Sequence, residues 1–486
     1  MGAPHLNPTR PAPASGAPVI PEPERPRRRH VGNAQKNRGP LGLDSCPWAY
    51  PALQGRASAQ RGRSGPKAGA SPRAEPGSPP GGAERLSTGQ RVARARRRLG
   101  WDQAQLAAAV GRSVSWVSKV ETGRLPLDRM SVVGQLAEAL DIEVIELTGQ
   151  PYRHDSSELD SGHAAIPGLR LALQQATMPG GALLLGGIEP PSLADVSVRV
   201  EAAERLRQDA KFTALGDVLP QILRDLIVAC DVADGDDLAR AESLMLRASH
   251  MARVSSNLLG HHDLGWSAVQ RELVAAERAE SPALRAAARW DLCGVWLYEG
   301  EVAAARDMAL RALDDLEPDL STADEKIRSL WGAMHLRAAV AWSRLWDRTE
   351  AESHLAEARR IAADLPVDGN VFQTQFNAVN AEIHSVEVSL ELGHPRDVLS
   401  RSELVDVMHI ASGERQSHFW VCTAAGQMMN GKAEAAATSI LRADAVAPQH
   451  VRNRPVARNL VDDLRSANRN ARTEEIRRLA GHMKLS

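Results

Sequence analysis

The stretch QAQLAAAVGRSVSWVSKVETG, residues 103–123, contains two short helical patterns separated by a tight turn. Asp102 precedes the first pattern, and its carboxylate is a favoured N-cap acceptor. Gly111 supplies the turn because glycine adopts a positive φ at little cost, and Ser113 can cap the second helix. The residues expected to face inward are Leu106, Ala107, Val110, Val117 and Val120. The sequence therefore predicts helix, turn and helix within this one stretch.

The segments on either side extend this motif into a small all-α bundle over residues 86–148. An amphipathic helix that ends at Gly100 buries Val92 and Leu99, and a later helix begins near Met130. The arginines expected on the outer face of the first helix are Arg91, Arg94, Arg96, Arg97 and Arg98. About five helices and no strand are predicted here.

This segment resembles the Cro and phage-repressor class of helix-turn-helix domains, also called the xenobiotic-response-element class. The resemblance rests on Gln103 at the start of the second helix, the turn glycine Gly111, two buried valines and the exit Glu121-Thr-Gly123. It implies a domain that binds double-stranded DNA and places the helix after the turn in the major groove.

The resemblance also implies roles for individual side chains. Gln103 would bond a phosphate at the N-terminus of the second helix, and Ser113 lies at the front of the third. Positions that match base contacts are Val114, Ser115 and Lys119, and positions that match backbone contacts are Arg112, Thr122 and Arg124. Lys119 is expected to carry most of the direct readout, because Val114 and Ser115 offer only a methyl contact and one hydroxyl. Shape readout could contribute more than usual. Trp116 is expected to face outward, toward a packing partner or the DNA backbone.

Charge is distributed unevenly, although the formal net charge is only −1. Lys and Arg outnumber Asp and Glu by 13 to 5 in residues 1–85 and by 9 to 7 in residues 86–150, whereas residues 151–486 carry 37 against 48. A basic front and an acidic rear are typical of a nucleic-acid-binding end joined to another kind of body. Residues 1–85 are rich in Pro, Gly, Ala and Arg, which predicts a disordered arm, either a basic tether or an inert extension.

Cysteine usage and hydropathy indicate a cytoplasmic protein, and the helix-turn-helix resemblance implies a bacterial-type one. Cys46, Cys230, Cys293 and Cys422 lie far apart and form no CxxC, which argues against a zinc site and against a secreted disulfide scaffold. No apolar run reaches the roughly 18 residues that a membrane-spanning helix needs. The N-terminus has Pro and Arg where a signal peptide has an apolar core. No membrane contact is expected.

The rest of the chain is predicted to be helical repeats. Residues 149–192 are expected to be a linker and an irregular segment, and residues 193–486 a solenoid of helical hairpins. Turn residues recur every 38–47 positions, at Gly260, Gly300, Asp347, Gly393 and Gly431. Two units resemble tetratricopeptide repeats, through Trp290-x2-Cys293-Gly294-x2-Leu297 and Trp420-x2-Thr423-Ala424-x2-Gln427.

Tryptophans in the repeats have two interpretations. Trp at helical spacing is usually core packing between hairpins. Alternatively, Trp290, Trp331 and Trp420 line a groove that holds a peptide, a small molecule or another protein. The combination of a repressor-type domain with tetratricopeptide repeats looks like the peptide-pheromone-responsive regulators of Gram-positive bacteria, so a peptide ligand is an analogy of architecture.

No motif for catalysis, metal binding or a cofactor occurs. The sequence lacks GxxxxGK[ST], GxSxG and HExxH, so an enzyme is not expected. The leading hypothesis is an all-α, sequence-specific transcriptional regulator that pairs two half-sites as a homodimer. The alternative is a protein-binding scaffold that uses its repeats and contacts DNA only incidentally.

Overall fold

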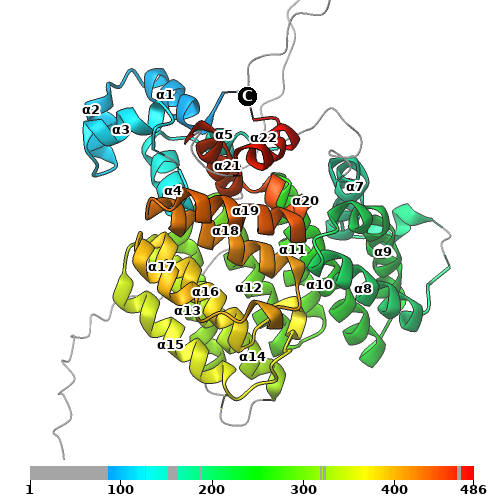
Figure 1. Ribbon diagram of the computed structural model, residues 1–486. Coiled ribbons are helices and arrows are strands. Elements are labelled where there is room, and N and C mark those ends of the chain that lie inside the picture. The colour runs from blue at the N-terminus through cyan, green and yellow to red at the C-terminus, as the bar shows by residue number, and fades with distance from the viewer. Residues whose placement is uncertain are drawn as a thin grey trace, which may run out of the picture. The chain divides into compact units, whose positions relative to one another are not determined.

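The computed structural model describes residues 86–125, 127–151, 162–186, 189–317, 320, 324–467 and 472–485 (Figure 1). Within these ranges every regular element is a helix, which confirms the all-α prediction. The expected disordered arm, residues 1–85, lies outside the described residues, and so does Cys46. The described residues all belong to one compact unit.

Five short helices make the N-terminal bundle, and their ends follow the caps expected from the sequence. Asp102 accepts from the backbone N–H of Gln105, and Ser113 accepts from that of Trp116. Gly111 turns the chain between them with φ of 61°. Buried side chains of all five helices meet in one core, in which Leu106, Leu136 and Leu147 are fully enclosed. The helices are α1 (Thr88–Arg98), α2 (Gln103–Ala109), α3 (Val114–Glu121), α4 (Met130–Ala139) and α5 (Val144–Thr148).

A helix lies inside the segment that the sequence suggested was a linker and irregular. Helix α7 (Ile166–Thr177) begins with Pro167 in its first turn and buries Leu169 and Leu173 against α9 (Phe212–Val232). The two Pro- and Gly-rich clusters beside this helix made its apolar periodicity hard to recognise in the sequence. A short 3-10 turn, η1 (Gly181–Leu185), follows, and then α8 (Leu193–Gln208).

Paired helices make up most of the remaining chain. Gly260, Gly300, Gly393 and Gly431 all have positive φ, and each lies at the turn within one pair. The first helices of successive pairs pack on one another, so the pairs stack. The pairs are α10 (Gly235–Leu258) with α11 (His262–Arg278), α12 (Pro282–Glu299) with α13 (Val302–Leu316), α14 (Glu325–Arg344) with α15 (Arg348–Ala362), α16 (Ala378–Glu391) with α17 (Pro395–Ser402), and α18 (Gly413–Met429) with α19 (Ala433–Val446). The short turns η3 (Val371–Gln373) and η4 (Val407–His409) and the helices α20 (Pro448–Asn453), α21 (Pro455–Ala467) and α22 (Thr473–His482) complete the chain.

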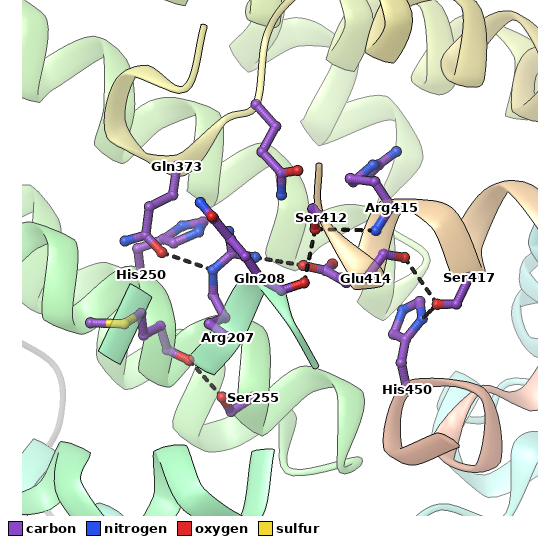
Figure 2. A network of polar contacts seen from close by, with 12 residues as sticks. Arg207, Gln208, His250, Ser255, Gln373, Ser412, Glu414, Arg415, Ser417 and His450 are labelled. Carbon is purple, nitrogen blue, oxygen red and sulfur yellow. Dashed lines mark hydrogen bonds and ion pairs between the residues drawn. The ribbon is translucent and has the colours of Figure 1, made fainter. Parts of the chain in front are cut away.

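An ion pair connects the beginning of this array to its end. Arg207, on α8, bonds Glu414 of α18 at 2.6 Å, and its Nε donates to Gln373 Oε1 at 2.8 Å (Figure 2). The Arg207 side chain is only 3% exposed. Ser412 adds a second link by donating to the carbonyl oxygen of Gln208. The stack of hairpins therefore closes back on α8.

The N-terminal bundle is held against the repeats by specific polar contacts. The backbone N–H of Ser131, in α4, donates to Glu391 of α16 at 3.0 Å. Asn459 of α21 donates to the carbonyl oxygen of Leu127 at 2.7 Å. Trp346, which follows α14, packs against the core of the bundle. The bundle is thus attached through α4 and the loop before it.

None of the helices in the described ranges combines the length and the apolar composition that crossing a bilayer requires.

Arg207→Ala should destabilise the whole array, because it removes the ion-pair partner of the Glu414 carboxylate and its link from α8 to α18. Breaking a buried ion pair costs about 3–5 kcal/mol. The control is Arg360→Ala, which removes the exposed partner of Glu357 and should cost less than about 1 kcal/mol. Thermal unfolding followed by circular dichroism measures both. Equal melting temperatures for the two variants would contradict the closure.

Candidate nucleic-acid interface

Helix α3 has a buried face and an exposed face. Val117 and Val120 are each 1% exposed and pack in the core of the bundle. On the opposite side, Val114 is 46% exposed, and Ser115 and Lys119 are also exposed. Lys119 has no ion-pair partner among the described residues. The three positions that the resemblance matched to base contacts thus share one uncovered surface, which we call the α3 face.

The residues at the two ends of α3 differ in how freely their side chains can contact a ligand. Arg124 is exposed and forms no ion pair with a described residue. Ser113 uses its oxygen as the cap acceptor and keeps its proton to donate. The Thr122 hydroxyl instead donates to the carbonyl oxygen of Ser118 at 2.7 Å. Ser113 and Arg124 are therefore the better placed of these three to donate to an anion.

Arg112 lies between two indole rings. Its Cζ is 5.8 Å from the ring centroid of Trp116 and 5.3 Å from that of Trp346, within the range of cation-π attraction. Trp116 is only partly exposed and packs against the core of the bundle, so of its two expected roles the structure supports packing. Because Trp346 belongs to the repeats, Arg112 joins the start of α3 to the body.

A buried ion pair fixes the other end of α3. Arg96 Nε lies 2.5 Å from Glu121 Oε1, and the two side chains are 11% and 6% exposed. Arg96 also donates to the carbonyl oxygen of Trp101 at 2.6 Å. Burial alone would raise the pKa of Glu121, but the bonds from Arg96 and Gln103 hold this pKa below its usual value. The carboxylate is thus kept ionised where α1, α2 and α3 meet.

Two sequence expectations need correction at this site. Arg96 was expected on the solvated face of the first helix but is buried, because Glu121 offers it the counter-charge that a buried guanidinium requires. Leu99 was expected to be buried but is 40% exposed. The phosphate contact expected of Gln103 stays a prediction, and in the absence of DNA its Nε2 donates to Glu121 Oε2 at 2.9 Å. Arg96 and Gln103 both bond Glu121, the acidic residue at the C-terminal end of α3.

The two attachment points also bring buried carboxylates together. Burial raises the pKa of Asp128, in the loop before α4, to about 6. Burial, with the nearby charges of Asp462 and Asp128, raises the pKa of Asp463 on α21 to about 8. Two acids that resist ionisation therefore lie where the bundle meets the repeats.

An inner cavity of about 150 Å³ lies within the repeats, lined by the first helices α10, α12, α14, α16 and α18. Of the three tryptophans assigned to a ligand groove, only Trp290 lines it. Trp331 is 8% exposed and packs in the core against His335. Trp420 packs against the core of the last hairpins, with Arg442 over its ring. Sequence analysis missed the polar lining of the cavity. The feature of the sequence that could have indicated this lining is a charged residue, Arg337, inside the mainly apolar stretch 330–342.

Groups that resemble catalytic or metal sites have structural explanations. Ser417 and His450 lie 2.5 Å apart, but Ser417 is fully buried and also donates to the carbonyl oxygen of Glu414. Among the described residues no group of histidine, cysteine and carboxylate side chains has a metal-binding arrangement. Cys230, Cys293 and Cys422 are buried free thiols, and burial raises the pKa of each to about 12.

The bundle and its α3 face define a helix-turn-helix domain, a class of domain that binds DNA. In agreement, residues 88–147 match the family model described as a helix-turn-helix domain. Neither the curated proteins nor the solved structures contain a match to this chain.

Glu121→Ala should loosen α3, because it strands the buried Arg96 and frees Gln103. We expect a loss of about 3–5 kcal/mol in local stability. Hydrogen exchange of the α3 amides measures it. Below pH about 4.5 the wild-type pair should itself weaken, because protonation of Glu121 removes a contribution that is complete only above the carboxylate's unfolded pKa.

The control for this variant is Glu146→Ala, which removes an exposed pair with Arg98 at 3.7 Å and should change α3 protection by less than about 1 kcal/mol. Equal exchange rates in the two variants would show that the Arg96 pair does not hold α3.

Asp463→Asn should raise the melting temperature at pH 8.5 and change it little at pH 4. A carboxyl whose folded pKa lies above its unfolded value destabilises the fold progressively as pH rises from the unfolded pKa, about 4, to the folded pKa, about 8. The amide cannot ionise, so the variant should escape this loss of stability. Asp314→Asn, at an exposed site on α13, is the control. A gain that does not depend on pH would contradict the assignment.

Proposed function

We propose that this protein is a sequence-specific DNA-binding transcriptional regulator in which α3 enters the major groove. One observation carries the proposal: the α3 face is uncovered although the bundle is packed against the repeats. The helix-turn-helix match over residues 88–147 supports the same conclusion. Base recognition needs a helix that is packed firmly on its inner face and exposed along its outer face.

The proposed contacts divide into two groups. Lys119 donates to base edges, Val114 contacts a thymine methyl group and Ser115 adds one hydroxyl. Arg112, Ser113, Thr122 and Arg124 contact the phosphate backbone and set the register. Gln103 has a lesser part than the family pattern implies, because Glu121 holds its amide.

We further propose that the protein acts in the cytoplasm as a homodimer, with the repeats serving dimerisation or signal sensing. A single bundle of this size covers one half-site, and proteins of this class gain specificity by pairing two half-sites about one helical turn apart. The attachment of the bundle to the repeats through Ser131 and Asn459 gives a signal in the repeats a route to α3.

Lys119→Ala should relax base preference at one position of the operator. Loss of one good base contact lowers discrimination by about 1–3 kcal/mol, with other positions unchanged. Selection of bound duplexes from a randomised library, followed by fluorescence anisotropy on the selected sequence and its point variants, measures this preference. A Lys119→Ala variant with the full wild-type preference would show that the register assigned to α3 is wrong.

Two further variants make this measurement specific. Lys326→Ala removes an exposed lysine at the start of α14 and should leave affinity and preference unchanged. Arg124→Ala should weaken binding to all sequences alike and reduce the slope of log K against log salt by about 1. Wild-type binding that depends on salt but does not distinguish the operator from random DNA would favour the scaffold hypothesis instead.

A further inference from the structure

The inner cavity is surrounded by parts of the chain far apart in sequence. The first helices of five hairpins form its wall, and Arg207 of α8 and His450 of α20 also line it. Met130 and Val144 of the helix-turn-helix bundle contribute to the same lining. The cavity therefore borders both the repeats and the helix-turn-helix bundle.

Arginine is abundant around the cavity, and carboxylates do not balance it. Three arginines have a carboxylate partner: Arg207 with Glu414, Arg253 with Asp291, and Arg344 with Glu391. A fourth carboxylate, Glu387, bonds His418. The cavity is lined by six arginines in all, namely Arg207, Arg253, Arg337, Arg344, Arg415 and Arg454. Six guanidinium groups against these four carboxylates leave an excess of two positive charges.

The histidines and the remaining acid do not change this balance. Burial lowers the pKa of His250, His384, His418 and His450, so these rings are neutral at pH 7. Burial beside Asp291 raises the pKa of Glu272 well above its usual value, which favours the protonated form of this acid.

Three of the cavity arginines have no ion-pair partner among the described residues. Arg337 stacks on the Trp290 ring at 3.9 Å, and its buried Nε lacks a hydrogen-bond partner. Arg415 has two such nitrogens, Nε and Nη2. The Arg454 guanidinium, among the described side chains, forms a hydrogen bond only with the imidazole of His418. Figure 2 shows Arg415 beside the Arg207 and Glu414 pair. These guanidinium groups are half-buried, and buried guanidinium nitrogens without a hydrogen-bond partner or counter-charge are costly, which favours an anion in this space.

We propose that the inner cavity binds a small organic anion, whose carboxylate or phosphate group pairs with Arg337, Arg415 and Arg454. Its size favours a small molecule over a peptide, because about 150 Å³ accommodates a molecule the size of benzene. Leu297, Val340 and Val456 provide apolar wall for the body of the ligand. The arginines select its charge, and Trp290 orients Arg337.

Occupation of the cavity also bears on the DNA-binding bundle, an extension that rests on the proposed function. Arg344 faces the cavity and bonds Glu391, and Glu391 accepts the backbone N–H of Ser131 at the start of α4. An anion that attracts Arg344 competes with Glu391 and weakens this attachment. Met130, beside Ser131, lines the cavity directly.

The binding test uses the full chain and three probes at constant ionic strength: benzoate, inorganic phosphate and benzamide, the neutral analogue of benzoate. We expect one or both anions to raise the melting temperature by at least about 2 °C and to saturate, as binding to the folded state requires. Benzamide should have no effect. Benzoate alone would identify a carboxylate site, and phosphate alone a phosphate site.

Arg337→Gln and Arg415→Gln, made separately, should each remove at least half of this shift. Neither should unfold the protein, because each removes an uncompensated charge. Arg360→Gln, on the exposed face of α15, should retain the full shift. The proposal is overturned if neither anion shifts the melting temperature, if benzamide matches benzoate, or if both cavity variants respond like Arg360→Gln.

The coupling test repeats the DNA titration on the selected operator with and without the active anion. We expect the Kd for DNA to change at least about threefold, with a reciprocal change in anion affinity. A melting shift without a change in Kd would leave the anion site standing and overturn the coupling. Failure to bind any duplex would overturn the proposed function while the melting shift still decides the site.

Discussion

The ion pair between Arg96 and Glu121 is the contact on which the DNA-facing geometry depends. Helix α3 has only eight residues, and a helix so short has little stability of its own. Its two buried valines pack in the core of the bundle. The Glu121 carboxylate, near its C-terminal end, bonds Arg96 of α1 and Gln103 of α2. Because these contacts lie on the inner side, the outer side remains available to a ligand.

A second constraint acts through the repeats. Each hairpin buries its apolar face only against its neighbours, so a linear stack leaves two ends. Here Arg207 and Ser412 join α8 to the last hairpins, and this closure encloses the inner cavity. The same array holds the bundle through Glu391 and Asn459. The DNA-binding part and the cavity are therefore connected by direct contacts.

Local signals allowed much of this to be predicted from sequence. Asp102, Gly111 and Ser113 specify caps and a turn within a few residues, and a glycine marks the turn inside most of the hairpins. Contacts between distant segments were not predictable. Nothing near Arg96 in the sequence shows that it meets Glu121, and no periodicity indicates that Arg207 reaches Glu414, 207 positions later.

The same distinction explains the errors about individual side chains. An arginine on a helix is usually solvated, so its burial is recognised only once its partner is placed. A tryptophan at helical spacing usually packs in a core but can also line a groove, and only the arrangement of the helices shows that Trp290 lines the cavity while Trp331 packs in the core. The cavity arginines come from α8, α10, α14, α18 and the residue after α20, and apart from Arg337 and Arg344 the successive ones lie about 40 to 80 residues apart in the chain, so no motif contains them.

Site-specific cross-linking from position 115 tests the central claim most directly. Ser115→Cys places a thiol on the α3 face, and in a Cys46→Ser background the described native cysteines stay unreactive because burial raises their pKa to about 12. With a short photoreactive label, the account predicts adducts confined to major-groove bases of one half-site in the selected operator. Adducts spread evenly over operator and random duplex, or no adducts in low salt, would contradict it.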